Sequence, residues 1–359
     1  DRTMDHSTTM PPTPPTMLAE RVGPVVPPTA APHPDVATWR PAAPSDLDAL
    51  VDLHAAIAEV DHPHWTQRRD ELAEAFGLSH VDVARDTLVG HAHDGRAIAH
   101  GLVMCPPGRE TKVRSLVLGG VHPGFRRRGI GRALLDWQLG RAREQLAESG
   151  ERLPGWVMAY VEQGVTDAAA LLDRAGLHVA RHFSTLERDL SAPIEAPRAT
   201  PDGLRVEPWA ERWSESARLA RNAAFADHWG SQSTDAESWR AMTAESALAP
   251  ALSFLAVAPD PVLGAEQVVA FVIALRNEED WAGQGFTSAY VRLVGVVRGH
   301  RGRGLARVLL AHHLAAAAAD GLERSTLDVD AENPTGALRL YAGMGYVVTH
   351  GHASHVREY

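Results

Sequence analysis

The sequence predicts a mixed α/β (α+β) protein built from two tandem, related domains. Each half of the chain shows the same order of apolar, strand-like runs and amphipathic, helix-like runs, and this order is typical of a sheet flanked by helices. A loop rich in arginine and glycine also occurs at the same place in each half, at residues 121–132 and 296–307. An internal repeat of this size indicates two copies of one folding unit.

Two proline-rich stretches mark the limits of the predicted domains. Residues 1–36 lack hydrophobic periodicity, so we expect an extended arm that rests on this chain or on a neighbouring copy. A second proline-rich stretch, residues 191–202, reads as the linker. The first domain then spans residues 37–190 and the second spans residues 203–359.

The predicted elements follow one another in the same order within each half. A short strand, a polar cap and an amphipathic helix open the two halves, at residues 37–60 and 202–225. Apolar runs then predict strands, and the arginine–glycine loop is followed by a long helix, a strand, a short helix and a final strand. The apolar runs lie at 96–105 and 115–121 in the first half and at 253–258, 268–275 and 290–297 in the second.

The composition restricts the classes of function. A formal net charge of −10 argues against a broad nucleic-acid surface. Because no membrane-length apolar run and no signal peptide stand out, we expect a cytoplasmic monomer or homodimer with no membrane or nucleic-acid partner. Cys105 is the only cysteine, and the histidine-rich stretches lack the spacing of a ligand set, so we expect no metal.

The arginine–glycine loops have the features of an anion-binding site. Where a strand turns into a helix, free backbone N–H groups and the helix dipole favour phosphate, while glycine lets the backbone approach it and arginine adds charged hydrogen bonds. The alternative is a glycine-rich turn with solvated arginines, which the presence of two matching loops disfavours. The loops do not match two other phosphate-binding motifs, the P-loop and the dinucleotide-binding fingerprint. The candidate phosphate-binding residues are Val121, Arg126, Arg127, Arg128, Gly129, Ile130, Gly131 and Arg132 in the first half, and Val296, Arg301, Gly302, Arg303, Gly304, Leu305, Ala306 and Arg307 in the second.

The loops that begin at Arg126 and Arg301 (Arg-x-x-Gly-x-Gly/Ala) resemble the acyl-coenzyme A pyrophosphate loop of the GNAT N-acetyltransferase superfamily. Residues 327–346 are similar to the closing strand–helix unit of that family, and the likeness covers residues 37–359. It is greatest for the actinobacterial two-domain type to which mycothiol synthase belongs. The resemblance implies, in each domain, a mostly antiparallel twisted sheet splayed at its fourth strand, and acetyl transfer from acetyl-coenzyme A (acetyl-CoA) to an amine in a ternary complex.

The same resemblance implies roles for residues of the second half. Backbone N–H groups of Val294, Gly295 and Val296 would hydrogen-bond the thioester and the pantetheine arm. Asn333 would hydrogen-bond pantetheine or the acceptor. Tyr341 would protonate the departing thiolate, although a tyrosine that merely packs in the core would show the same pattern.

The sequence identifies the base that accepts the proton of the amine less clearly than the other site residues. Some relatives of the two-domain type carry a glutamate early in the strand before the loop, where this chain has Tyr290. We rank Asp330 and His228 highest as replacements, the first for its strand position and the second because the stretch around it is similar to that subgroup. The other candidates are Asp227, Asp328 and Glu332.

The two halves are not equivalent. Aligning residues 167–177 with residues 336–346 places Leu172 opposite Tyr341, and Gly164 falls opposite Asn333. Leucine cannot donate a proton, so we expect one working site in the second half and a degenerate first domain, for which structural coenzyme A binding stays open.

These observations favour an acetyl-CoA-dependent N-acetyltransferase that acts on a small-molecule amine. Mycothiol synthesis, in which a cysteinyl pseudodisaccharide is acetylated, is an alternative. A non-catalytic acyl-CoA sensor or scaffold and a protein-lysine acetyltransferase are the others.

Overall fold

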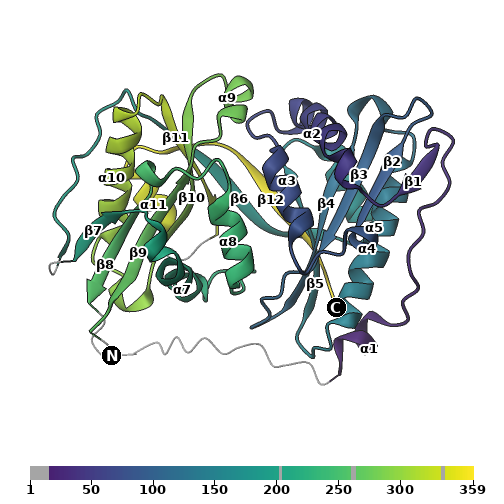
Figure 1. Cartoon of the computed structure of the whole chain (residues 1–359), viewed down its shortest axis with the longest axis horizontal. Helices are drawn as coiled ribbons and strands as arrows, with labels where there is room; N and C mark the ends of the chain where they lie inside the picture. Colours follow the sequence, from purple (N-terminus) through teal and green to yellow (C-terminus); the bar gives the residue numbers. More distant parts are fainter. Residues whose placement is uncertain (1–15, 202–203, 260–263, 333–335) are drawn as a thin grey trace.

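The computed structural model describes residues 16–201, 204–259, 264–332 and 336–359. These residues form two lobes joined by one twelve-stranded sheet (Figure 1). Strands of the first half are β1 (Thr38–Arg40), β2 (Thr87–His91), β3 (Ala97–Met104), β4 (Val113–Val121), β5 (Gly155–Glu162) and β6 (His178–Asp189). Those of the second are β7 (Arg205–Pro208), β8 (Phe254–Pro259), β9 (Glu266–Leu275), β10 (Ser288–Val296), β11 (Arg324–Asp330) and β12 (Val347–Glu358).

Helices cover both faces of the sheet in each half. In the first half, α5 packs on one face and α2 on the other; in the second half, α10 and α7 take these places. No helix within the described ranges is long and apolar enough to cross a membrane. The α-helices are α1 (Leu18–Val22), α2 (Leu47–Asp61), α3 (Arg69–Gly77), α4 (Val83–Asp86), α5 (Ile130–Glu148), α6 (Thr166–Arg174), α7 (Ser214–Phe225), α8 (Ala236–Ala244), α9 (Glu278–Gln284), α10 (Leu305–Ala319) and α11 (Ala337–Ala342).

The local sequence explains the central elements of the second half. Strand β9 is a continuous apolar run because α7 and α10 bury both of its faces. Helix α10 is rich in alanine and leucine, which have the highest helix propensities. It begins after Gly304 and ends before Gly321, and both glycines have a φ of 78° that side chains disfavour.

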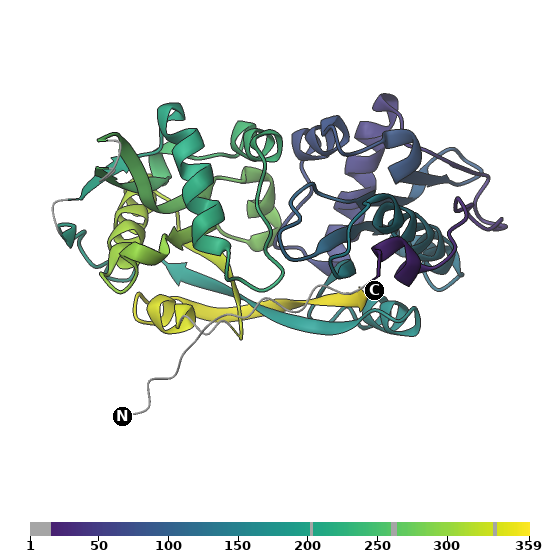
Figure 2. The same cartoon turned by 90° about the horizontal axis from the view of Figure 1, so that it is seen from below.

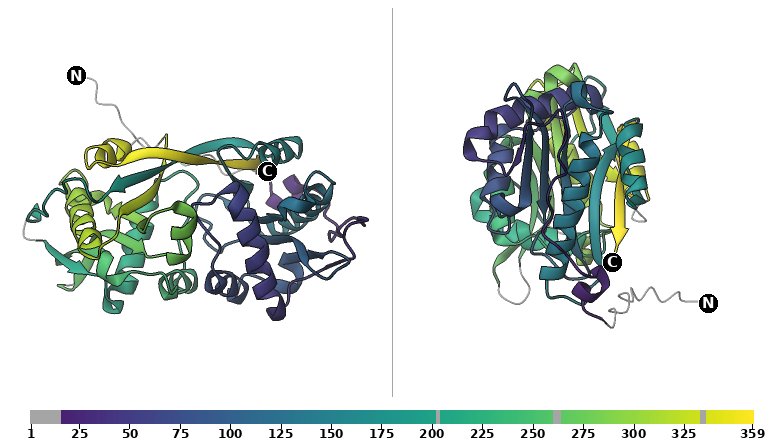
Figure 3. Two further views of the ribbon diagram at one scale, coloured as in Figure 1. Left: turned by 90° about the horizontal axis from the view of Figure 1, so that it is seen from above. Right: turned by 90° about the vertical axis from the view of Figure 1, so that its right-hand side faces the viewer.

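The last strand of each half lies in the sheet of the other half. Strand β6 pairs with β11 and β12 of the second half, and β12 pairs with β5 of the first, giving the central order β5-β12-β6-β11. Figure 2 and Figure 3 show β6 and β12 as long neighbouring strands that run from lobe to lobe. Strand pairing therefore crosses the predicted limits, 37–190 and 203–359, and the two halves share one sheet.

The predicted fold class is confirmed. The sheet is mixed and mostly antiparallel: within the described chain, parallel pairing joins only β4 to β5 and β10 to β11. Both parallel pairings stop partway, after Leu116 in β4 and after Val291 in β10. The fourth strand of each half is therefore splayed from its neighbour.

The described part of the proline-rich arm rests on the first half of the same chain. Leu18 is fully buried among the side chains of that half. Farther along, Arg143 of α5 donates to the carbonyl oxygen of Val22 over 3.0 Å, and Pro28 lies against Gly140. The arm thus follows α5 from its carboxyl end toward its amino end.

The strand exchange predicts that neither half folds alone. A fragment that ends at residue 200 leaves β6 without two partners and β5 with an open edge, and such edges are unstable or associate. We expect each fragment, 1–200 and 201–359, to lack a cooperative thermal transition by circular dichroism, whereas the two co-expressed fragments form a 1:1 complex that melts once. Separate cooperative melting of the two monomeric fragments would contradict the exchange.

Candidate functional site

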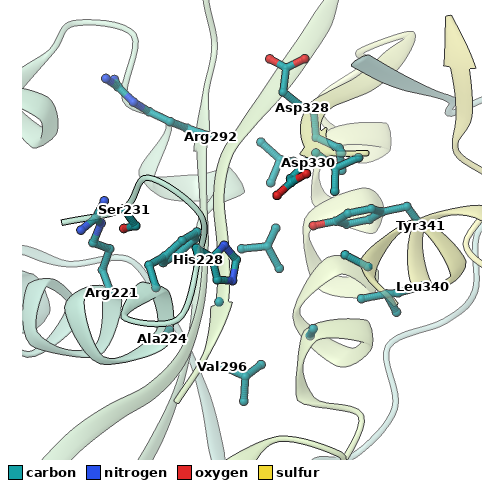
Figure 4. A pocket seen from close by; sticks show the side chains of 18 of the residues that line it. Arg221, Ala224, His228, Ser231, Arg292, Val296, Asp328, Asp330, Leu340 and Tyr341 are labelled. Atoms are coloured by element: carbon teal, nitrogen blue, oxygen red, sulfur yellow. The ribbon is translucent and has the colours of Figure 1, made fainter. Parts of the chain in front are cut away.

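A cleft opens where β10 and β11 diverge. The two strands pair only from Ser288 to Val291 of β10, and a bulge at Arg292 follows. Beyond this point a cleft of about 670 Å³ separates β10 from β11 and α11. Figure 4 shows Tyr341 and Asp330 on one side of the cleft and His228 and Arg221 on the other.

Strand β10 presents unpaired backbone donors to this cleft. The N–H of Val297 donates to the carbonyl oxygen of Val269 in β9 over 2.9 Å. Because successive residues of a strand point their N–H groups to opposite sides, the N–H groups of Val294 and Val296 point away from β9, into the gap. Gly295 between them is required, since a Cβ there would lie 2.3 Å from the ring of Phe271.

The loop after β10 leads into the amino end of α10. Gly302 and Gly304 have φ values of 76° and 78°, and no side chain caps the helix. The first N–H groups of α10 are therefore free to bind a ligand, and the helix dipole makes this end electropositive. Gly302, Gly304, Leu305 and Ala306 all line the cleft.

The arginines of the second loop are held by protein groups. Arg301 donates through Nε to the carbonyl oxygen of Val296 over 3.1 Å and through a terminal nitrogen to that of Ala224 over 2.8 Å. Arg307 forms an ion pair with Glu195 of the linker, with distances of 2.6 and 2.9 Å. Both line the cleft, whereas Arg303 lines a neighbouring hollow between the linker and α10.

Tyr341 lies in α11 and faces the cleft from the side opposite His228. Its side chain is 7% exposed, and its hydroxyl makes no hydrogen bond to any described residue. Burial raises the pKa of Tyr341 to about 12. The hydroxyl is therefore protonated at neutral pH and available as a donor to a group in the cleft. Asn333, predicted to contact the ligand, lies outside the described residues.

The two favoured bases, Asp330 and His228, differ in whether a neighbouring side chain already binds them. The carboxylate of Asp330 is bound by the guanidinium of Arg181, with distances of 3.0 to 3.1 Å. The ring of His228 makes no hydrogen bond to a described residue, and burial, the largest cause, lowers its pKa. His228 is therefore neutral at pH 7 and has a nitrogen free to accept a proton.

The remaining candidate bases are engaged by neighbouring groups. Asp227 pairs with Arg298 at 2.8 Å, and Glu332 pairs with Arg181 at 3.0 Å. Asp328 accepts hydrogen bonds from the hydroxyls of Thr185 and Tyr290, the latter over 3.0 Å. A carboxylate thus stands beside Tyr290, the position at which the family resemblance led us to look for a glutamate.

Strands β4, β5, β6 and β12 contribute cleft residues that sequence analysis missed. Arg114 of β4 and Tyr160 of β5 line the cleft, as do Phe183 of β6 and His352 of β12. The rings of Phe183 and His352 stack with centroids 4.9 Å apart. A charged arginine within the apolar run of β4 was the one local signal for this group; the strand exchange that assembles the rest has no local signature.

The loop of the first half has the same backbone form as that of the second. Arg126 donates through Nε to the carbonyl oxygen of Val121 over 3.0 Å, which matches the contact of Arg301 with its own strand. Arg127 has a φ of 62° and occupies the place of Gly302. This left-handed conformation is unfavourable for a residue with a Cβ, and it persists here because the fold requires it.

The cradle of the first half is covered. The ring of His33 hydrogen-bonds the carbonyl oxygen of Arg128 over 2.7 Å, and Asp35 lies 3.5 Å from the guanidinium of the same arginine. Gly129 lies below His33. Behind the loop, apolar side chains occupy the gap beside β4; they are Val117, Val121, Ile130, Leu171 and Leu172. Gly131 lies against Val121 and Leu171, and Arg132 is exposed in the first turn of α5.

Comparison with known proteins identifies the class to which this arrangement belongs. Residues 47–176 and 214–346 each match the model of the acetyltransferase (GNAT) family. A mycothiol acetyltransferase of Thermobispora bispora is 31% identical over 304 residues, which cover 84% of this chain and 93% of that protein. The chain belongs to the GNAT acetyltransferase family.

Solved structures agree with the tandem arrangement. A GCN5-related N-acetyltransferase from Sphaerobacter thermophilus superposes with a TM-score of 0.64 and 26% identity, covering 89% of this chain and 95% of that one. A tandem GNAT protein from the clavulanic acid biosynthesis pathway shares the fold, with a TM-score of 0.62 and 17% identity over 89% of this chain and 98% of its own.

The protein is therefore an acyltransferase of the tandem GNAT type, and acetyl-CoA is its acetyl donor. The cleft fits this donor: the free N–H groups of β10 can pair with an extended amide chain, and the glycine-rich start of α10 can hold phosphate groups. Both features lie in the second half.

The covered first loop predicts one coenzyme A site per chain. Isothermal titration with coenzyme A should give a stoichiometry near one, because the arm and the apolar filling occupy the corresponding space of the first half. Gly304→Asp, which places a carboxylate where phosphate would bind and a side chain at a φ of 78°, should abolish binding. Gly129→Asp serves as the matched control and should leave the affinity unchanged; two sites in the wild type would contradict the prediction.

Proposed function

We propose that the second half acetylates the amine of a small molecule by direct transfer in a ternary complex, and that the first half performs no transfer. The observation that carries the proposal is the placement of Tyr341 and His228, whose side chains make no hydrogen bond to a described residue, on opposite sides of the cleft beside the free N–H groups of β10. A leaving group, an electrophile and a nucleophile can each meet a suitable protein group there.

The strand N–H groups act on the electrophile. Acetyl-CoA supplies an activated acetyl group when bound. The N–H groups of Val294 and Val296 are fixed by pairing with β9, so they can stabilise negative charge on the thioester oxygen without rearranging. The glycine-rich loop, residues 302–306, orients the donor by holding its phosphates.

Tyr341 acts on the sulfur that leaves. Its pKa of about 12 keeps the hydroxyl protonated over the whole working range, so it can hydrogen-bond the developing thiolate and provide a proton. Leu172, at the matching position of the first half, is buried and has no proton to give. This difference supports a single catalytic half.

His228 acts on the amine. A base must be deprotonated before the reaction begins, and the lowered pKa of His228 meets this condition at neutral pH. The oxygens of Asp330, in contrast, are occupied by the guanidinium of Arg181. We therefore assign proton acceptance to His228 and a positioning role to Asp330.

Acetylation of a cysteinyl pseudodisaccharide is a second candidate reaction, favoured by the likeness to mycothiol acetyltransferases over most of the chain. Asp328, hydrogen-bonded by Tyr290, offers a carboxylate where that subgroup has glutamate. A thiol-release assay over an amine panel that includes this pseudodisaccharide distinguishes the two. Binding of coenzyme A without release for any amine would favour a sensor, and release only with lysine-containing peptides would favour a protein-lysine acetyltransferase.

Replacing Tyr341 should remove most of the turnover. Tyr341→Phe deletes only the hydroxyl, and loss of a general acid typically costs about 100-fold or more in kcat. Tyr346→Phe is the matched control, because the hydroxyl of Tyr346 points into the core, 2.8 Å from Ser325, and is not part of the cleft. Equal kcat values for the two variants would contradict the assignment.

Replacing His228 should change the pH dependence of kcat. The pKa of His228 lies below the ordinary 6.5, so wild-type kcat should be level at neutral pH and should fall on the acid side as the ring becomes protonated. In His228→Gln this acid limb should disappear and kcat should fall by about 100-fold. If Asp330→Asn removes the acid limb and His228→Gln preserves it, the two roles are reversed.

A further inference from the structure

Two arginines of the cleft lack a carboxylate partner. Five arginines line it, and three of these are paired: Arg292 with Glu245, Arg301 with Asp227 and Arg307 with Glu195. Arg114 of β4 and Arg221 of α7 form no ion pair with any described residue.

The existing contacts of Arg114 and Arg221 are with uncharged groups. Arg114 donates to the carbonyl oxygen of Gly230 over 2.8 Å, and its buried Nε has no hydrogen-bond partner. Arg221 donates to the carbonyl oxygen of Gln232 over 2.7 Å, and its guanidinium lies 5.4 Å from the ring of Phe225. Each therefore keeps donors free to bind a ligand.

Two half-buried guanidinium groups close to each other, those of Arg114 and Arg221, are unfavourable unless an anion binds between them. Burial lowers the pKa of both groups, and the charge of Arg114 adds to this effect on Arg221, whose pKa falls to about 10. Both arginines remain cationic at neutral pH. The charge of Glu110 acts on both groups and raises their pKa values, but Glu110 forms no ion pair with either arginine, so two neighbouring guanidinium groups of the cleft have no carboxylate in contact among the described residues.

The position of these two arginines separates them from the donor site. Arg114 and Arg221 both hold the segment 230–232, which follows His228. In Figure 4, Arg221 lies across the cleft from Tyr341, with His228 between them. The donor phosphates have their own cradle at the start of α10, so the second anion site faces the acceptor.

We propose that Arg114 and Arg221 form a carboxylate-binding subsite for the acceptor, and that the preferred acceptors are amino acids or other amines that carry a carboxylate. This inference rests on the proposed function. A guanidinium fork matches the two oxygens of a carboxylate, and two neighbouring forks fix its orientation. The rings of Trp229 and Phe183 beside them supply an apolar wall for the rest of the acceptor.

The carboxylate takes no part in bond making. The amine nitrogen forms a bond to the acetyl carbon, the carbon–sulfur bond breaks, the amine proton passes to His228 and the sulfur receives a proton from Tyr341. The products are an N-acetylated amino acid and coenzyme A. Because Arg114 belongs to the first half and Arg221 to the second, the subsite exists only when both halves are present.

The test compares amino acids with their carboxamides in the thiol-release assay, using the full chain. Wild type should prefer the acid over the matched amide by about 10- to 100-fold in kcat/KM, the usual range for a charged hydrogen bond. Arg114→Gln and Arg221→Gln should remove this preference by raising KM for the acid, leaving kcat for the amide and KM for acetyl-CoA unchanged. Arg221→Lys, which keeps the charge, should retain part of the preference.

Arg218→Gln is the matched control on α7, because Arg218 pairs with Glu215 and does not line the cleft. Equal use of acid and amide by the wild type would overturn the subsite while the proposed function stands. A raised KM for acetyl-CoA in place of the acceptor would overturn it in favour of a coenzyme A phosphate.

A binding measurement separates failure of the subsite from failure of the proposed function. Succinate, compared with sodium chloride at equal ionic strength, should raise the melting temperature of the wild type and not that of Arg221→Gln. If no amine releases thiol, the proposed function fails, and the succinate shift alone decides whether the subsite exists. A shift with inorganic phosphate and none with succinate would overturn the assignment to carboxylate.

Discussion

The antiparallel pairing of β6 with β12 is the constraint on which the cleft depends. These strands join the halves along a register that runs from Val347 opposite Glu187 to Val356 opposite His178. The pairing brings Phe183 and His352 to the mouth of the second-half cleft and fixes β5, and with it Tyr160, at their side. A shift of one residue in β6 or β12 would turn the side chains of that strand to the other face of the sheet.

The splay of the fourth strands has opposite consequences in the two halves. In the second half the gap beside β10 stays open as a cleft, and Tyr341, whose hydroxyl has no hydrogen-bond partner among the described residues, faces into it. In the first half the same gap is filled by Val117, Val121 and Leu172, which form part of the core. Duplication thus preserved the backbone of the cradle in both places and left only one of them accessible.

Local patterns account for what the sequence could predict. The strands, the long helices and the two loops follow from periodicity, glycine placement and the match between the halves, whereas Tyr341 was singled out by the resemblance to the GNAT family. The strand exchange could not be predicted in this way, because an alternating or apolar run defines a strand without defining its neighbour. Arg114 was missed for the same reason: its role depends on a segment, residues 229–232, that meets β4 only in the folded protein.

The backbone of the last residue completes the first lobe. The N–H and carbonyl groups of Tyr359 exchange hydrogen bonds with those of Gly155 at the start of β5, over 2.8 and 3.0 Å, and Arg21 of the arm contacts the same carbonyl oxygen. During synthesis on the ribosome the first lobe is translated long before β12 emerges. Its β5 edge therefore stays unpaired until β12 has been translated. A chain that stops before β12 leaves that edge open, so the first lobe depends on a strand that belongs to the second repeat.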